Sequence, residues 1–148
     1  MTYKVLDIAN ELLRYAQNAN GGELMSNMKL QKMLYYQQGF HLAMFGEPLF
    51  EEEIEAWMYG PVVPSVYDNY KSYKRNGIPC NEAEELCFKD PKEEALFNEV
   101  CKVYGKFSAI GLMNMTHGEA PWKNTPTGEG NVIDKSKMKS FFKSRLKK

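Results

Sequence analysis

The sequence predicts a mainly α protein: a compact, single-domain bundle of about six helices with at most a small β-hairpin, spanning residues 1–148. Three observations carry this prediction. Apolar residues recur at helical spacing through most of the chain, capping residues precede several of these runs, and glycine or proline ends them. The length of 148 residues and the hydrophobic fraction of 43% suit one folded domain rather than a disordered chain.

The first part of the chain predicts two helices. Residues Tyr3–Gln17 place apolar side chains at helical spacing until Asn20-Gly21-Gly22 interrupts the pattern. Ser26 is positioned to cap a second helix, and Gly46 to end it. The stripe expected to be buried in this second helix consists of Leu30, Met33, Leu34, Gln37, His41 and Met44.

The middle of the chain predicts a short strand and a rigid turn. Residues Phe50–Tyr59 alternate between apolar and polar side chains, which is typical of a strand. The apolar set on one face is Ile54, Ala56 and Met58. Pro61 and Pro64 exclude a continuous helix between them, but Pro64 suits the first turn of a helix that runs to about Lys74.

The second half of the chain predicts three further helices. Asp90-Pro91 and Glu93 supply an N-cap, a proline at the first helical position and a glutamate at the third. A shorter helix is expected over Ser108–Thr116, then a loop over Gly118–Gly130, and Asp134 caps the last helix. The residues expected to be buried in these helices are Ala95, Leu96, Val100, Val103 and Tyr104, then Met138, Phe141, Phe142 and Leu146.

Composition limits the class of protein. The formal net charge of zero argues against a general attraction to nucleic acid or to anionic membranes. Charged residues interrupt the first seventeen positions, so no signal peptide is expected, and the longest uncharged run, Met33–Gly46, is too short to cross a membrane. The three cysteines, Cys80, Cys87 and Cys101, suit neither a disulfide framework nor a metal site. We therefore expect a cytoplasmic protein with reduced cysteines, of which Cys87 and Cys101 lie in the core, and with no metal or cofactor.

Residues suited to catalysis are few. The chain holds only two histidines, His41 and His117, and no sequence around a serine or cysteine resembles that of a known nucleophile. His41 lies on an apolar helical stripe, which favours a hydrogen-bonded core histidine. The sequence therefore predicts no enzyme. A cryptic enzyme centred on His117 and Glu119 is kept as an alternative.

Basic residues gather at the C-terminal end. From Asp134 onward the chain has seven basic residues and one acidic residue, so this segment carries +6 and the rest −6. Lys139, Lys143 and Lys147 could contact phosphates, which keeps a nucleic-acid-binding regulator as an alternative. Phe141 and Phe142, however, are expected to pack against the rest of the domain. The sequence also contains no nucleic-acid recognition motif beside these lysines. A solvated polar face on a docked helix is favoured.

Three longer motifs are more specific. They are KLQKMLYY at Lys29–Tyr36, EAWMYGPVVP at Glu55–Pro64 and THGEAPW at Thr116–Trp122. Together with a closing helix at Asn131–Phe142, they resemble the Panacea domain, the family of SocA-like antitoxins and GepA-type phage-associated proteins. The resemblance covers nearly the whole chain in a fixed order.

This resemblance implies binding rather than catalysis. Panacea proteins neutralise a toxin encoded beside them by direct contact, and SocA-type members instead act as adaptors that deliver the toxin to the ClpXP protease. Many relatives lie in prophages or mobile elements. We therefore expect an antitoxin-like module whose partner is a cognate protein toxin, with a ClpXP-type protease as a second partner.

The rigid aromatic segment around Tyr59 is the expected partner surface. Tyr59-Gly60-Pro61 predicts a tight turn, from which Trp57 and Tyr59 can reach Trp122. Such aromatic residues serve both small cores and interface hot spots, so they either close the core or contact a partner. His117 and Glu119 would cap a helix or orient a partner residue. The candidate partner-binding residues are Trp57, Tyr59, Pro61, Pro64, His117, Glu119 and Trp122.

Overall fold

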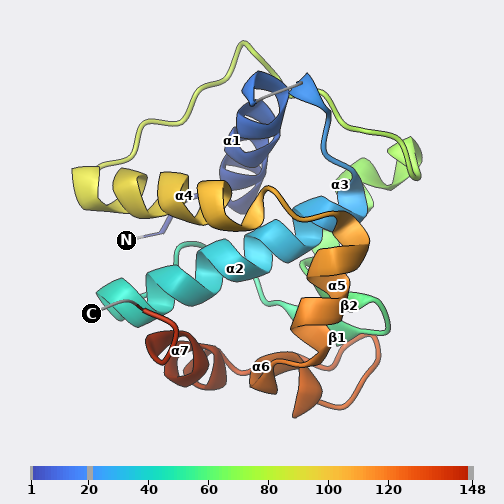
Figure 1. Cartoon of the computed structure of the whole chain (residues 1–148), viewed down its shortest axis with the longest axis vertical. Coiled ribbons are helices and arrows are strands. Elements are labelled where there is room, and N and C mark those ends of the chain that lie inside the picture. The colour runs from blue at the N-terminus through green and yellow to red at the C-terminus, as the bar shows by residue number, and fades with distance from the viewer. Residues whose placement is uncertain (1, 20–21, 147–148) are drawn as a thin grey trace.

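The computed structural model describes residues 2–19 and 22–146 and confirms a mainly α protein with one small hairpin (Figure 1). The helices in the described part of the chain are α1 (Val5–Asn18), α2 (Asn27–Phe45), α3 (Pro64–Tyr70), α4 (Pro91–Tyr104), α5 (Ala109–His117), α6 (Ala120–Lys123) and α7 (Lys135–Lys143). The antiparallel strands are β1 (Glu55–Trp57) and β2 (Gly60–Val62), and a short 3-10 helix, η2 (Lys71–Tyr73), follows α3. None of the described helices is both long enough and apolar enough to span a membrane.

The predicted helix starts are confirmed by their hydrogen bonds. Ser26, Asp90, Ser108 and Asp134 each accept a backbone N–H from the first turn of α2, α4, α5 and α7, respectively. Gly46 ends α2 with a left-handed φ of 78°. Of the three residues expected to end α1, Asn20 and Gly21 lie outside the described residues. The loop expected over residues 118–130 contains a short helix, α6, because Pro121 suits a first helical turn.

Helix α2 crosses the middle of the molecule, with α1 and α4 on one side and α5, α6 and α7 on the other (Figure 1). The stripe predicted on this helix is buried except at Met44. Because other elements surround the helix, the face opposite the stripe is buried too. Met44, which was expected to be buried, is 49% exposed because it lies in the last turn, where α2 emerges from the bundle.

Polar side chains of α2 connect it to its neighbours. Gln38 accepts the backbone N–H of Leu49 at 2.7 Å and donates to the carbonyl of Phe50 at 2.8 Å. Gln37 donates to the carbonyl of Phe97 in α4 at 3.1 Å. Buried amide side chains are satisfied in this way, so each of these bonds fixes the position of another segment against α2.

His41 is the hydrogen-bonded core histidine that the sequence predicts. Its Nδ1 donates to the carbonyl of Glu47 at 2.7 Å, and its Nε2 lies 2.6 Å from the carboxylate of Glu93. The other oxygen of that carboxylate accepts the hydroxyl of Tyr3 at 2.6 Å. Glu93, expected to complete the cap of α4, thus joins α4 to α2 and to the N-terminal segment instead.

Several burial predictions need correction. Helix α4 buries Phe97, Val100 and Cys101, whereas Ala95 and Val103 are exposed, because the face that carries Phe97 and Cys101 meets Gln37 of α2. Burial raises the pKa of the Cys101 thiol, as expected for a core cysteine. Cys87 is exposed rather than in the core, because it lies in the long loop before α4. Met58 is exposed because the predicted strand ends at Trp57 and Met58 begins the turn.

Helix α7 packs on α2 through a contact that requires a glycine. A Cβ atom placed on Gly39 would lie 2.1 Å from the ring of Phe142, a fully buried residue of α7. Phe142 also packs edge-to-face against Tyr35, with ring centroids 5.3 Å apart. The two helices can approach this closely only because position 39 has no side chain.

We expect Gly39→Ala to destabilise the protein by about 1–3 kcal/mol, because the methyl group overpacks the core against the Phe142 ring. Urea denaturation measures the change in the free energy of unfolding. Gly118→Ala is the matched control, since a Cβ atom at Gly118 would meet its nearest neighbour at 3.7 Å. Equal stability of Gly39→Ala and Gly118→Ala would contradict this account of the α2–α7 contact.

Candidate functional site

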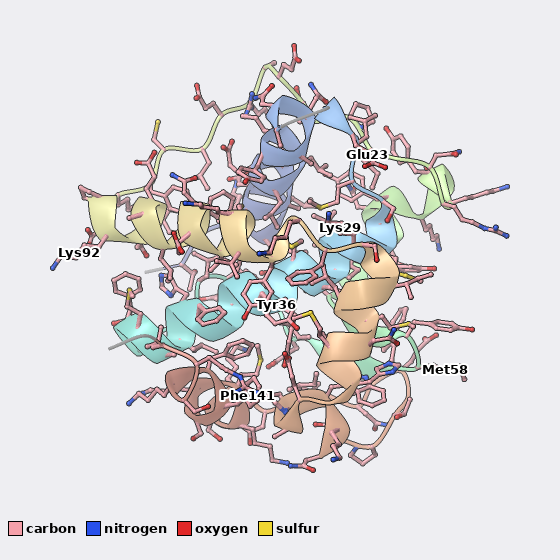
Figure 2. All side chains as sticks on the ribbon, in the orientation of Figure 1. Glu23, Lys29, Tyr36, Met58, Lys92 and Phe141 are labelled. Carbon is pink, nitrogen blue, oxygen red and sulfur yellow. The ribbon has the colours of Figure 1, made fainter. Side chains whose placement is uncertain are left out.

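The hairpin turn presents two large apolar side chains to solvent. Trp57 pairs with Gly60, so Met58 and Tyr59 form the two-residue turn, and they are 65% and 60% exposed. Met58 lies at the outer edge of the hairpin (Figure 2). Gly60 has a φ of 111°, a conformation that residues with a side chain rarely adopt. The turn is therefore a defined ledge, and we call Met58 and Tyr59 the turn ledge.

Two tryptophans hold this ledge in place. The indole N–H of Trp122 donates to the backbone carbonyl of Trp57 at 2.8 Å, and the indole N–H of Trp57 donates to Glu55 at 2.9 Å. The ring of Trp57 also packs edge-to-face against Tyr67, with centroids 5.2 Å apart. Both tryptophans are half-buried, so they serve the fold and still border the surface next to Tyr59.

The two prolines of the motif fix the backbone behind the turn. Pro61 is buried and pairs with Ala56 across the hairpin. Pro64 is half-buried and takes the first position of α3, as predicted. Between them, the backbone N–H of Val63 donates to Gln31 of α2 at 2.9 Å. The ledge is thus anchored directly to the central helix.

Glu119 points into the core rather than toward solvent. Its two carboxylate oxygens accept the hydroxyls of Tyr35 and Tyr36, each at 2.9 Å. Burial raises the pKa of the Glu119 carboxyl, and the two hydroxyl donors oppose that change. Burial likewise raises the pKa of both phenols. Glu119 therefore joins the segment after α5 to α2, and its side chain does not cap α6.

His117 lies against Trp122 at the end of α5. The two rings are stacked with centroids 4.1 Å apart. The Nε2 atom of His117 is buried and has no hydrogen-bond partner in the described part of the chain. His117 and Glu119 are thus engaged by different neighbours, a tryptophan ring and two tyrosine hydroxyls, and neither lines the cavity described next.

A cavity of about 490 Å³ lies beside Tyr59, between the start of α2, the hairpin, α3 with η2, and the start of α5. Its aromatic side chains are Trp57, Tyr59 and Tyr67, and its apolar wall continues through Met28, Val62 and Ile110. Its cationic side chains are Lys32, Lys71, Lys74 and Arg75. No Asp or Glu is among the described residues that line it. The cavity is therefore mostly apolar, and the described charged residues that line it are all cationic.

Lys32 is the most unusual residue of this cavity. It is 1% exposed, and its alkyl chain passes so close to Gly60 that a Cβ atom there would lie 2.6 Å from the Lys32 Cε atom. Its ammonium group makes no hydrogen bond or ion pair with any residue that the structure describes. Burial accordingly lowers the pKa of Lys32 to about 8.

Lys32 was not among the residues predicted from the sequence, although the composition of α2 carries one signal. Lys29 and Lys32 are the only lysines or arginines in α2, and the helix has no Asp or Glu. Lys29 finds a partner, since its Nζ donates to the carbonyl of Gly105 at 2.6 Å. A helix with so few charged residues is expected to be buried, and a buried lysine normally has a hydrogen-bonding or ionic partner. A lysine without such a partner, as at position 32, indicates a candidate binding site.

The basic residues in and directly after α7 have several neighbours within the chain. Lys135 pairs with Glu53 at 2.9 Å, and Arg145 lies over the ring of Phe141. Lys139 is half-buried near Gly46, at the C-terminal end of α2, where helix carbonyls favour a cation. Lys143 is exposed, and Lys147 lies outside the described residues. Among the residues that the structure describes, no three His, Cys, Asp or Glu side chains form a metal-binding group.

Comparison with known proteins gives two matches. The family described as "Antitoxin SocA-like, Panacea domain" matches residues 30–123. The chain is also similar to Antitoxin SocA of Caulobacter vibrioides (strain NA1000 / CB15N), with 31% identity over 123 residues. That alignment covers 74% of this chain and 64% of the relative, so the chain spans less than two thirds of its length. No solved structure matches the chain. The expected closing motif, Asn131–Phe142, lies beyond the matched range.

We expect Lys32→Met to stabilise the protein at pH 7 by about 2–3 kcal/mol, because it removes a buried, unpartnered cation and keeps most of the volume. The folded-state pKa lies below the unfolded value, so wild-type stability rises as the pH increases from about 8 toward 10, and the advantage of the variant narrows. Urea denaturation at pH 7 and pH 9.5 measures both effects.

Lys29→Met is the matched control for Lys32→Met. It lies on the same helix but leaves the carbonyl of Gly105 without its donor, so we expect no gain in stability. A Lys32→Met variant less stable than the wild type at pH 7 would show that the ammonium group stabilises the fold.

Proposed function

The chain belongs to the family of SocA-like antitoxins with a Panacea domain, and from this premise we propose that it neutralises a cognate protein toxin by direct contact, without catalysis. The toxin would be encoded next to it, on a phage or another mobile element. Delivery of the toxin to a ClpXP-type protease is the second mode within this proposal, and it requires the same first contact.

The observation that supports this proposal is the turn ledge. Met58 and Tyr59 expose large apolar surface on a backbone fixed by Trp122 and by Gln31. Rigid aromatic residues at a partly apolar surface lose little conformational entropy on binding, and such residues dominate interface energetics. Because the side chains of this fixed turn lie in solvent, they are available to a protein partner and contribute little to the core.

The other candidate residues take supporting roles in this proposal. Trp57, Trp122 and the stacked His117 border the ledge and extend the contact surface. Pro61 and Pro64 fix its backbone, and Glu119 anchors the neighbouring segment from inside through Tyr35 and Tyr36. In this proposal the exposed and half-buried side chains contact the toxin, and the buried side chains hold them in position.

Nucleic-acid binding through Lys139, Lys143 and Lys147 is the alternative. It predicts salt-dependent binding of a generic duplex that disappears when these lysines are neutralised. Lys135 and Arg145, which lie nearby, contact Glu53 and Phe141 of the same chain, and these contacts do not favour nucleic-acid binding. A cryptic enzyme at His117 and Glu119 would require both side chains to face a substrate, and Glu119 faces two tyrosines.

The proposal is tested by co-expression of this chain with the product of its neighbouring gene. Growth rescue with a stable complex would support direct neutralisation. Rescue with loss of the partner that depends on ClpXP would support the adaptor mode. A neighbouring protein that is harmless alone and does not bind the chain would remove the main support for the antitoxin proposal.

We expect Met58→Ala and Tyr59→Ala to weaken co-purification of the toxin by about tenfold or more each, as expected for interface hot spots worth 1–2 kcal/mol or more. Thermal stability should stay close to that of the wild type, because both side chains are exposed. Met44→Ala is the matched control, since Met44 is an exposed methionine at the end of α2. Equal binding by Met58→Ala, Tyr59→Ala and Met44→Ala would show that the partner binds elsewhere.

A further inference from the structure

The cavity beside Tyr59 has the features of a ligand site rather than of a packing defect. Its volume of about 490 Å³ lies within the usual range for small-molecule sites. Apolar and aromatic walls surround a buried ammonium group without a partner among the described residues. A buried cation is costly unless it is paired, and nothing in the described part of the chain pairs with Lys32. Since the Lys32 Nζ atom is not among the fully buried unpartnered atoms, it opens onto the cavity, where an anion from outside the chain could pair with it.

The charges around the cavity indicate more than one negative charge on that anion. Lys71, Lys74 and Arg75 join Lys32 in the lining, and no described acidic residue lines it. Lys71 also lies 3.8 Å from Asp68, but both side chains are exposed, so this pair is weak. A carboxylate would balance one of these charges, whereas a phosphate group balances two and accepts hydrogen bonds from several donors.

The aromatic side chains indicate a planar ring attached to the anion. Trp57 and Tyr67 form an edge-to-face pair with centroids 5.2 Å apart, and Tyr59 is an exposed ring beside them. Nucleobases stack on such side chains with a favourable energy that depends little on the base. A ring along the aromatic wall would leave its phosphate free to approach the lysines.

We propose that this cavity binds a nucleoside phosphate, with its base against Trp57 and Tyr59 and its phosphate at Lys32. The depth of Lys32 argues for a small ligand, because a buried ammonium lies beyond the reach of a duplex backbone that follows the surface. Lys74, at the edge of the cavity, has a φ of 56°, a conformation in which glycine would be less strained. This site is independent of the toxin proposal, although Trp57 and Tyr59 belong to both.

Isothermal titration calorimetry on the full chain tests this proposal. The probes are AMP, GMP, ADP and GDP, with adenosine, guanosine and inorganic phosphate as partial ligands. We expect at least one nucleotide to bind with a dissociation constant of roughly 1 µM to 1 mM, and its nucleoside and free phosphate to bind at least about tenfold more weakly.

Variants then locate the site. Lys32→Met should weaken nucleotide binding by about tenfold or more, as expected for loss of a charge-assisted hydrogen bond, whereas Lys29→Met should leave it unchanged. Lys74→Gly is a second variant that removes a cation while favouring the observed backbone conformation, and a loss of about threefold or more is expected.

Four results would overturn the proposal. They are the absence of binding by all four nucleotides, equal affinity for inorganic phosphate and nucleotides, full affinity in Lys32→Met, and tighter, steeply salt-dependent binding of a single-stranded oligonucleotide. None of these results bears on growth rescue by the co-expressed chain. The two proposals can therefore fail separately.

Discussion

The burial of α2 on all sides is the constraint on which the rest of the structure depends. A helix in this position cannot leave its polar groups to water, so most of its buried polar side chains bond to neighbouring segments. Gln37 bonds to α4, Gln38 to the segment around Phe50, and Gln31 to the residue before α3. Tyr35 and Tyr36 share the carboxylate of Glu119. The polar residues of α2 thus specify where the surrounding elements dock, and the apolar residues supply most of the stabilisation.

Much of the fold follows from local chemistry that the sequence displays directly. Capping residues such as Ser26 and Asp90 act within one turn of chain, so they predict helix starts without knowledge of the packing. The buried face of a helix is different, because it depends on what lies across from it. Neighbours on all sides of α2 bury the face opposite its predicted stripe as well, and the buried face of α4 is the one that meets Gln37. Neither outcome is encoded in the spacing of apolar residues alone.

The candidate site divides in the same way. The rigid turn at Tyr59 was predictable, because proline and glycine restrict the backbone locally. The inward position of Glu119 was not, because it depends on two tyrosines more than eighty residues earlier in the chain. Lys32 was hidden for the same reason. A lysine in a helix is ordinarily expected on a solvated face, and only the closure of the hairpin over it, with Gly60 against its alkyl chain, removes it from water.

Lys32 is the exception among the buried polar side chains of α2. Every other buried polar side chain discussed on this helix is matched by a donor or an acceptor of the chain, whereas Lys32 is not. Packing does not explain why position 32 is a lysine, because an apolar side chain of similar volume would fill the same space at a lower cost in free energy. Groups of this kind are common at functional sites, where a ligand or partner supplies the missing interaction. Since Lys32 lies beneath the turn ledge, the same closure of the hairpin that buries the cation also fixes Met58 and Tyr59 in solvent. The hairpin that carries the ledge, held by Trp122 and by Gln31 of α2, is therefore also the element that covers the unmatched charge of Lys32.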